Sequence, residues 1–131
     1  MIKKMNIVIV GFGNIGSYFY NYLKTNKKTL FDKTNTIPNI VYVSAKSLGK
    51  KRKLKIPKSL YLKNCISATK LKNVDIIIEL IGGAEGVAKK LVFEALKNKK
   101  HVITANKALV AKYGDQLAKI AEKNKVNFEF E

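Results

Sequence analysis

Two unbroken runs of branched apolar residues mark the clearest strands in the chain. Residues 5–10 end in Ile7, Val8, Ile9 and Val10 directly before a glycine, and residues 74–81 carry three consecutive isoleucines and end at a Gly-Gly pair. Unbroken apolar runs, unlike alternating ones, are typical of strands that a parallel sheet buries on both faces. We therefore expect buried strands at 5–10 and 74–81.

Helical spacing follows the first of these runs. Ile15, Phe19, Tyr22 and Leu23 lie four, three and one residues apart, which predicts one apolar face of a helix that ends near residue 27. The polar stretch 28–39 indicates a connection.

A second strand is expected at 40–43, where Ile, Val, Tyr and Val follow one another. Residues 44–60 are basic and lack periodicity. Residues 61–72 predict only a short strand and then a short helix around 67–71.

The second half of the chain repeats the alternation. Apolar residues at alternating spacings of one and three predict a helix over 84–98, and residues 101–104 predict another strand. Asn106 can cap the helix that follows, Gly114 is a candidate break in it, and 126–130 predict a last strand. That helix is expected to bury Val110, Leu117, Ala118 and Ala121.

Strands that alternate with helices predict a doubly wound α/β fold with a mostly parallel sheet and right-handed crossovers. The chain has 131 residues, which fits one domain over 1–131. No apolar run approaches the roughly 18 residues of a membrane span. Cys65 is the single cysteine and His101 the single histidine; we expect both to be structural, with no metal site and a cytoplasmic location.

Charge adds a second candidate function. The chain has 26 Lys and Arg against 9 Asp and Glu, a formal net charge of +17, which is typical of proteins that bind polyanions. Nearly all of this charge is lysine spread along the whole chain, which favours a lysine-rich surface over a nucleic-acid site. The one dense cluster is Lys50, Lys51, Arg52 and Lys53.

A glycine pattern carries the clearest chemistry. Gly11, Gly13 and Gly16 follow a predicted strand directly and open a predicted helix, which is the arrangement of a dinucleotide-binding turn. In such turns the first glycine makes the bend, the second leaves room for a pyrophosphate, and the third lets the helix pack on the strand. The backbone of the whole turn, including Phe12, Asn14 and Ile15, is expected to hold the pyrophosphate at the positive end of the helix dipole.

Residues at the end of the second strand determine whether such a turn prefers NAD or NADP. An NAD site normally has Asp or Glu there, which binds the ribose 2′-OH. This chain has Ser44, Lys46 and Ser47 instead, and no acidic residue between Asp32 and Asp75. We expect Ser44 and Lys46 to contact the cofactor and to favour NADP, with NAD as an alternative; a solvated basic loop would explain the same residues.

Polar residues also end two later strands. Thr104 ends the 101–104 strand and Lys107 follows it, at the edge where open α/β sheets bind ligands. A lysine there can polarise a carbonyl or move a proton, or it can be a solvated lysine in the first turn of a helix. Glu79 interrupts an apolar strand, either as a partner for a site lysine or as a hydrogen-bonded carboxylate at the strand end.

Several blocks together resemble the cofactor domain of the homoserine dehydrogenase family. They comprise 75–83, Ala95 and Leu96, 101–109, Phe128 and Glu129, with the glycine turn and the basic stretch ending at Lys51 and Arg52. The block from Thr104 to Leu109 is the most specific. The resemblance covers essentially the whole chain but only the N-terminal part of the family's chain.

This resemblance implies NAD(P)-dependent interconversion of homoserine and aspartate semialdehyde in threonine and methionine biosynthesis. It implies that Ile81 and Gly82 line the nicotinamide half of the cofactor and that Lys107 is catalytic, at the junction with the substrate. It also implies a homodimer for the full-length enzyme. Because the family's substrate domain would lie beyond residue 131, we expect this segment alone to bind cofactor without turnover. The alternative function is a stand-alone nucleotide-sensing Rossmann module.

Overall fold

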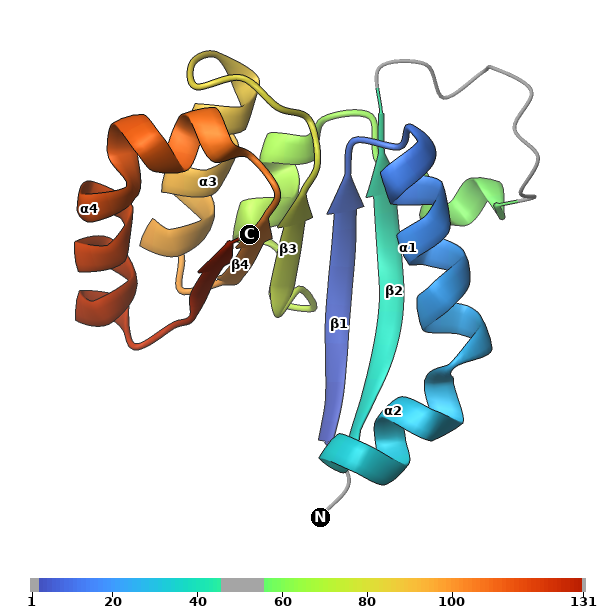
Figure 1. Ribbon diagram of the computed structural model, residues 1–131. Coiled ribbons are helices and arrows are strands. Elements are labelled where there is room, and N and C mark those ends of the chain that lie inside the picture. The colour runs from blue at the N-terminus through green and yellow to red at the C-terminus, as the bar shows by residue number, and fades with distance from the viewer. Residues whose placement is uncertain (1–2, 46–55, 131) are drawn as a thin grey trace.

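The computed structural model describes residues 3–45 and 56–130, and its centre is one parallel sheet (Figure 1). The strands are β1 (Lys3–Val10), β2 (Thr36–Ser44), β3 (Ile76–Glu79), β4 (His101–Thr104) and β5 (Phe128–Phe130). Their order across the sheet is β2-β1-β3-β4-β5, and every neighbouring pair is parallel. The predicted doubly wound α/β fold is confirmed.

The strand order reverses direction next to β1. The chain first crosses from β1 to β2 on one side, and then builds β3, β4 and β5 outward on the other side. In open sheets of this kind, ligands bind outside the carboxyl ends of the strands at such a reversal. In Figure 1 these carboxyl ends are the arrow tips of β1, β2 and β3 at the top.

Helices cover the two faces of the sheet unequally. They are α1 (Asn14–Thr25), α2 (Lys27–Thr34), α3 (Val87–Lys97) and α4 (Lys107–Asn124), with short 3₁₀ turns at Lys58–Leu60 and Cys65–Lys70. Helices α1 and α2 lie beside β1 and β2, whereas α3 and α4 cover the opposite face (Figure 1). None of these helices, within the residues that the structure describes, is long and apolar enough to cross a bilayer.

Each layer has its own apolar core. Alternate residues of β1 point to opposite faces, so Ile7 and Ile9 join a cluster with Tyr20 and Leu23 of α1. Val8 and Val10 instead join the larger cluster beneath α3 and α4. The unbroken apolar sequence of β1 is therefore explained by burial on both faces.

The apolar face predicted for α1 is wrong in part. The helix buries Gly16, Tyr20 and Leu23, whereas Ile15 is 63% exposed and Tyr22 is 41% exposed. The reason is close packing, because a Cβ on Gly16 would lie 2.4 Å from the carbonyl oxygen of Gly11. Only the glycine can approach the turn so closely, and its side of the helix therefore faces the sheet.

The region 28–39, expected to be a connection, is mostly regular structure. Residues Lys27–Thr34 form α2, none of whose residues is buried, so no apolar periodicity marks it. Asn35 ends this helix in the left-handed conformation at φ 56°, a role in which Asn is common. Strand β2 then starts at Thr36 and includes Pro38, which it can tolerate because β2 is an edge strand.

The later elements agree better with the sequence. Helix α3 forms within 84–98, as predicted, and buries its apolar face. Helix α4 runs unbroken through Gly114, since one glycine costs only about 1 kcal/mol and the helix packs on α3 and β5. It buries Leu109, which the periodicity missed, and leaves Ala118 exposed. Of the short strand expected near residue 61, only a single bridge from Tyr61 to Val43 forms.

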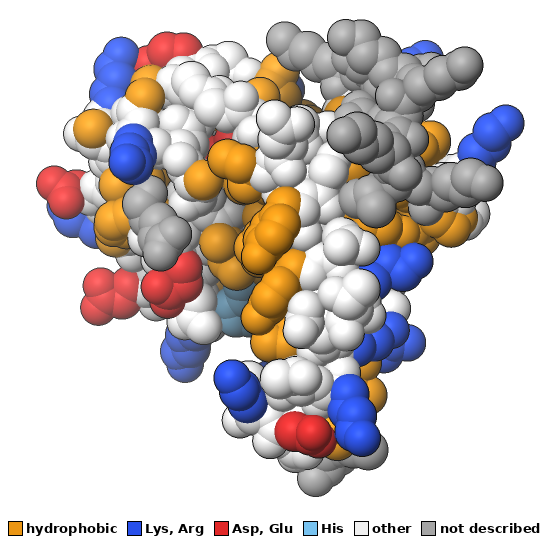
Figure 2. All heavy atoms as spheres, turned by 45° about the vertical axis from the view of Figure 1, so that its right-hand side comes forward, with side chains coloured by type: hydrophobic (Ala, Val, Ile, Leu, Met, Phe, Trp, Pro, Cys, Tyr) orange, Lys and Arg blue, Asp and Glu red, His pale blue; other side chains and the backbone are white. Residues whose placement is uncertain are grey.

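Among the described residues, no helix covers one half of one sheet face. On the α1 side, the register places Ile78 of β3 beside Ile103 of β4; Ile78 is buried in the cluster with Tyr20 and Leu23 of α1, whereas Ile103 lies outside that cluster. Ile103 is 37% exposed as a result. Figure 2 shows hydrophobic side chains gathered along this bare face, with the single histidine next to them.

The two glycines at the start of the β1–α1 turn should differ sharply in their effect on stability. Gly11 has φ +94°, and a Cβ there would lie 2.6 Å from the carbonyl carbon of Leu80, whereas a Cβ on Gly13 meets nothing within 4 Å. We expect Gly11→Ala to lower the free energy of unfolding by about 2–4 kcal/mol and Gly13→Ala by less than about 1 kcal/mol. Urea unfolding measures both, and equal losses would contradict the strained contact at Gly11.

Candidate functional site

Three loops meet where β1, β2 and β3 end. The N–H of Gly11 donates to the carbonyl oxygen of Ser44 at 2.8 Å, which ties the glycine turn to the end of β2. The N–H of Leu80 donates to the carbonyl oxygen of Val10 at 2.8 Å, which ties the end of β1 to β3. The turn is thus fixed from both sides at the point where the strand order reverses.

The N-terminus of α1 presents uncapped backbone to this edge. Gly13 is the N-cap, makes no side-chain cap, and is followed by a first turn without acidic residues. The first N–H groups of a helix have no partner inside the helix, and together with the helix dipole they favour an anion. Since Gly13 is exposed and a Cβ on it would meet nothing within 4 Å, an anion could approach the backbone there.

The remaining residues predicted around this turn differ in what they can offer. The ring of Phe12 is buried and packs edge-to-face on Tyr20 with centroids 5.8 Å apart, so only its backbone faces a ligand. Asn14 and Ile15 are exposed. Ser44 lies at the carboxyl end of β2 beside the turn, as predicted, and is 4% exposed. Lys46 lies outside the described residues.

Glu79 is a fully buried carboxylate at the end of β3. One oxygen accepts the N–H groups of Ile81 at 2.7 Å and Gly82 at 3.0 Å, and the other accepts the hydroxyl of Thr104 at 2.6 Å. Of the two interpretations that the sequence left open, the hydrogen-bonded strand-end carboxylate is the one that forms. It fixes the start of the β3–α3 loop.

Asn106 continues this network into α4. Its backbone N–H donates to the Thr104 hydroxyl at 3.0 Å, and its side-chain oxygen accepts the N–H of Leu109 at 3.0 Å, so it caps the helix as predicted. Its side-chain amide also donates to the carbonyl oxygen of Gly83 at 2.6 Å. The ends of β3 and β4 and the start of α4 therefore share one set of buried hydrogen bonds.

The residues predicted for the nicotinamide half lie on the open side of this network. Ile81 is 36% exposed, and Gly82 is exposed with φ 90°, a conformation that favours glycine. Lys107 is exposed at the first residue of α4, directly after the Asn106 cap. The Thr104 hydroxyl, by contrast, is engaged by Glu79 and Asn106.

A second polar cluster, Glu85 with Lys89, Lys112 and Tyr113, was not found from the sequence. The Glu85 carboxylate accepts a hydrogen bond from Lys112 Nζ at 2.7 Å and another from the Tyr113 hydroxyl. Lys89 Nζ forms an ion pair with the same carboxylate at 3.5 Å. Lys89 Nζ also lies 4.2 Å from the centroid of the Tyr113 ring and donates to its hydroxyl at 3.1 Å. The four-residue spacing of Glu85 and Lys89 is a sequence signal for that pair, but Lys112 and Tyr113 meet Glu85 only in the folded chain.

Hydrogen bonds from Lys112 and Tyr113, with attraction to Lys112 and Lys89, lower the pKa of the Glu85 carboxyl to about 2. A carboxyl with a lowered pKa stabilises the fold above its ordinary pKa and loses that contribution as the pH falls through the lowered value. The cluster therefore stays ionised and intact throughout the neutral range.

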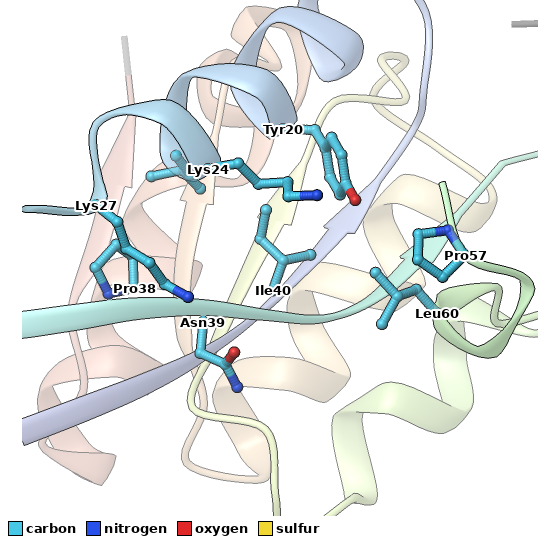
Figure 3. Close-up of a pocket in the computed structure, with 9 residues that line it drawn as sticks. Tyr20, Lys24, Lys27, Pro38, Asn39, Ile40, Pro57 and Leu60 are labelled. Carbon is cyan, nitrogen blue, oxygen red and sulfur yellow. The ribbon is translucent and has the colours of Figure 1, made fainter. Parts of the chain in front are cut away.

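The cavity shown in Figure 3 lies away from this edge. It has a volume of about 160 Å³ and sits between α1, the first half of β2 and the Lys58–Leu60 turn, with Tyr20, Lys24 and Ile40 among its lining residues. None of the described site residues lines it. The candidate site at the carboxyl edge of the sheet and this cavity are therefore two different places on the molecule.

Comparison with known proteins identifies the family to which the chain belongs. A family model described as the NAD-binding domain of homoserine dehydrogenase matches residues 11–131. The homoserine dehydrogenase of Bacillus subtilis is 34% identical over 99% of this chain and 30% of its own length. That of Neisseria gonorrhoeae is 33% identical over 99% of this chain and 29% of its own length.

Solved structures give the same result. A crystal structure of Staphylococcus aureus homoserine dehydrogenase superposes with a TM-score of 0.90 and 35% identity, over 100% of this chain and 33% of that protein. The enzyme from Thiobacillus denitrificans gives a TM-score of 0.86 at 30% identity, over 98% and 30% of the two chains. The chain thus spans about a third of the length of these relatives, and it belongs to the homoserine dehydrogenase family as its NAD-binding domain.

Proposed function

We propose that residues 1–131 form one NAD(P)-binding domain that holds a dinucleotide along the carboxyl edge of the sheet. The observation that carries this proposal is the geometry of the β1–α1 turn, which is open at Gly13, tight at Gly16 and followed by an uncapped helix. With the pyrophosphate on this turn, the backbone from Gly11 to Gly16 supplies N–H groups to it. The adenosine ribose then reaches the end of β2, and the nicotinamide half lies on the β3 and β4 side.

In the whole enzyme, we infer, this domain serves NAD(P)-dependent interconversion of L-homoserine and L-aspartate 4-semialdehyde in the cytoplasm. Its support is the family to which the chain belongs. The bound dinucleotide supplies hydride transfer, and this chain supplies its position. Ile81 and Gly82 line the nicotinamide half, the buried Thr104 supports them through Glu79, and Lys107 meets the substrate at the exposed start of α4.

Lys107 is the catalytic residue in this proposal. Its ammonium group can donate a hydrogen bond to the carbonyl oxygen of the semialdehyde or move a proton to and from the hydroxyl oxygen of homoserine. Other residues must hold the substrate, and we place them in a separate substrate domain of a homodimeric enzyme. The same reaction serves threonine and methionine biosynthesis.

We also propose that the cofactor is NADP in preference to NAD. The end of β2 places Ser44 beside the glycine turn and offers no carboxylate to a ribose 2′-OH. In this proposal the ammonium group of Lys46, two residues after Ser44 in the sequence, binds the 2′-phosphate. An acidic residue at this point would repel that phosphate.

Gly13→Val should abolish dinucleotide binding while leaving the fold intact. A side chain at this exposed position projects into the space proposed for the pyrophosphate and contacts no protein atom at its Cβ. The rise in melting temperature that NADPH causes should disappear in the variant. Asn21→Val, on the exposed side of the same helix, is the matched control and should keep the rise. A normal rise in Gly13→Val would exclude the turn as the phosphate site.

NADPH should bind about 5- to 30-fold more tightly than NADH, since one ammonium near the 2′-phosphate contributes roughly 1–2 kcal/mol after desolvation and screening. The preference should shrink as salt rises. Fluorescence titrations of both dinucleotides at two salt concentrations measure it.

Lys46→Glu should narrow or reverse this ratio, because it removes an attraction and adds a repulsion. Lys123→Glu changes the net charge equally in the last turn of α4 and should leave the ratio unchanged. Equal affinities for NADPH and NADH in the parent chain would contradict the 2′-phosphate site.

The chain of 131 residues should bind dinucleotide without oxidising homoserine. Hydride transfer needs a substrate held against the nicotinamide, and we assign that task to residues of the separate domain. Steady-state absorbance of the reduced nicotinamide, with homoserine and NADP, tests this. Clear turnover would contradict this prediction, provided that it survives dialysis and is abolished by Gly13→Val. The segment would then be active by itself.

A further inference from the structure

The loop between β3 and α3, residues 80–86, is held at its beginning, its middle and its end. Glu79 binds the N–H groups of Ile81 and Gly82 at its start, and the Asn106 amide binds the carbonyl oxygen of Gly83 in its middle. At its end, Glu85 is bound by Lys112 and Tyr113. Two of these three attachments come from α4, so this helix sets the position of the loop.

The last attachment is unlike the others, because it is made by exposed side chains on a glycine-rich segment. Gly82, Gly83 and Gly86 have φ of 90°, 85° and 75°, and glycines lose more conformational freedom on ordering than other residues. A loop of this composition needs side-chain attachments to keep one conformation. Glu85 is the one acidic residue that the loop carries, and Lys89, Lys112 and Tyr113 all contact it.

We propose that Glu85, clamped by Lys112 and Tyr113, is a positioning residue that holds the β3–α3 loop in the shape that receives the nicotinamide half of the dinucleotide. This inference rests on the function proposed above. The loop lies beyond the end of β3, on the opposite side of the glycine turn from β2 and its ribose site. A preformed wall there spares the cofactor the entropy of ordering the loop on binding.

The α4 side of this attachment is itself supported by α3. The Tyr113 ring packs edge-to-face on Phe93 of α3 with centroids 5.9 Å apart, so its hydroxyl is directed by a fixed ring and not by a free side chain. Lys89 lies over the same ring. Tyr113→Phe therefore removes the hydroxyl that Glu85 accepts and keeps the ring packing, which makes it a clean probe of positioning.

Two ligands separate positioning from general stability. NADPH carries the nicotinamide, whereas 2′-phosphoadenosine diphosphoribose has the same adenosine 2′-phosphate and pyrophosphate without it. We expect Glu85→Ala and Tyr113→Phe each to lower the affinity for NADPH about 3- to 10-fold. The affinity for 2′-phosphoadenosine diphosphoribose should change less than about twofold. The double variant should lose no more NADPH affinity than the single variant with the larger loss, since both changes break the same attachment.

The matched control is Glu122→Gln, which removes an exposed carboxylate near the far end of α4 and should alter neither affinity. Isothermal titration of the 131-residue chain measures all of these affinities. The positioning role would be overturned if both ligands lost affinity equally, or if neither variant lowered the affinity for NADPH. A parent chain that binds neither ligand would instead overturn the proposed dinucleotide site, and the inference with it.

Discussion

The buried carboxylate of Glu79 is the constraint on which the binding edge depends. A carboxylate removed from water is stable only where donors replace its hydration, and here two backbone N–H groups and one hydroxyl do so. Those donors belong to the β3–α3 loop and to β4. Satisfying one charge therefore fixes where a strand ends, how the next loop leaves it and how the neighbouring strand is aligned.

The glycine turn adds a second constraint of a different kind, which is a shortage of space. The backbone at Gly11 lies against Leu80 and Ile81, and the backbone at Gly16 lies against Gly11. The β1–α1 turn, the β3–α3 loop and the first turn of α1 are thus packed backbone to backbone, with no side chain between them. Such close contacts leave the backbone little room to shift. Gly13 is the open position in this turn, because a Cβ there would meet nothing within 4 Å.

The sequence predicted the parts of this structure that depend on local pattern. Strand β1, the apolar face of α3 and the Asn106 cap follow from runs, periodicity and capping chemistry, and the glycine pattern fell in its expected context. Helix α2 was not predicted because none of its residues is buried, so it shows no apolar periodicity. The buried face of α1 was misassigned because it is set by Gly16, a residue with no hydrophobic signal. In the Glu85 cluster only the Glu85–Lys89 pair is local in sequence; the contacts to Lys112 and Tyr113 depend on how α4 packs, so no local pattern could reveal them.

The bare half of the sheet face gives this chain an unusual balance of forces between molecules. Exposed isoleucine on a flat sheet favours contact between copies, while a formal net charge of +17 keeps them apart. Charge repulsion weakens beyond a Debye length of about 8 Å at physiological ionic strength, whereas apolar attraction is strengthened by excluded salts such as sulfate. We therefore expect the chain to be most dispersed in dilute buffer and to associate as salt is added.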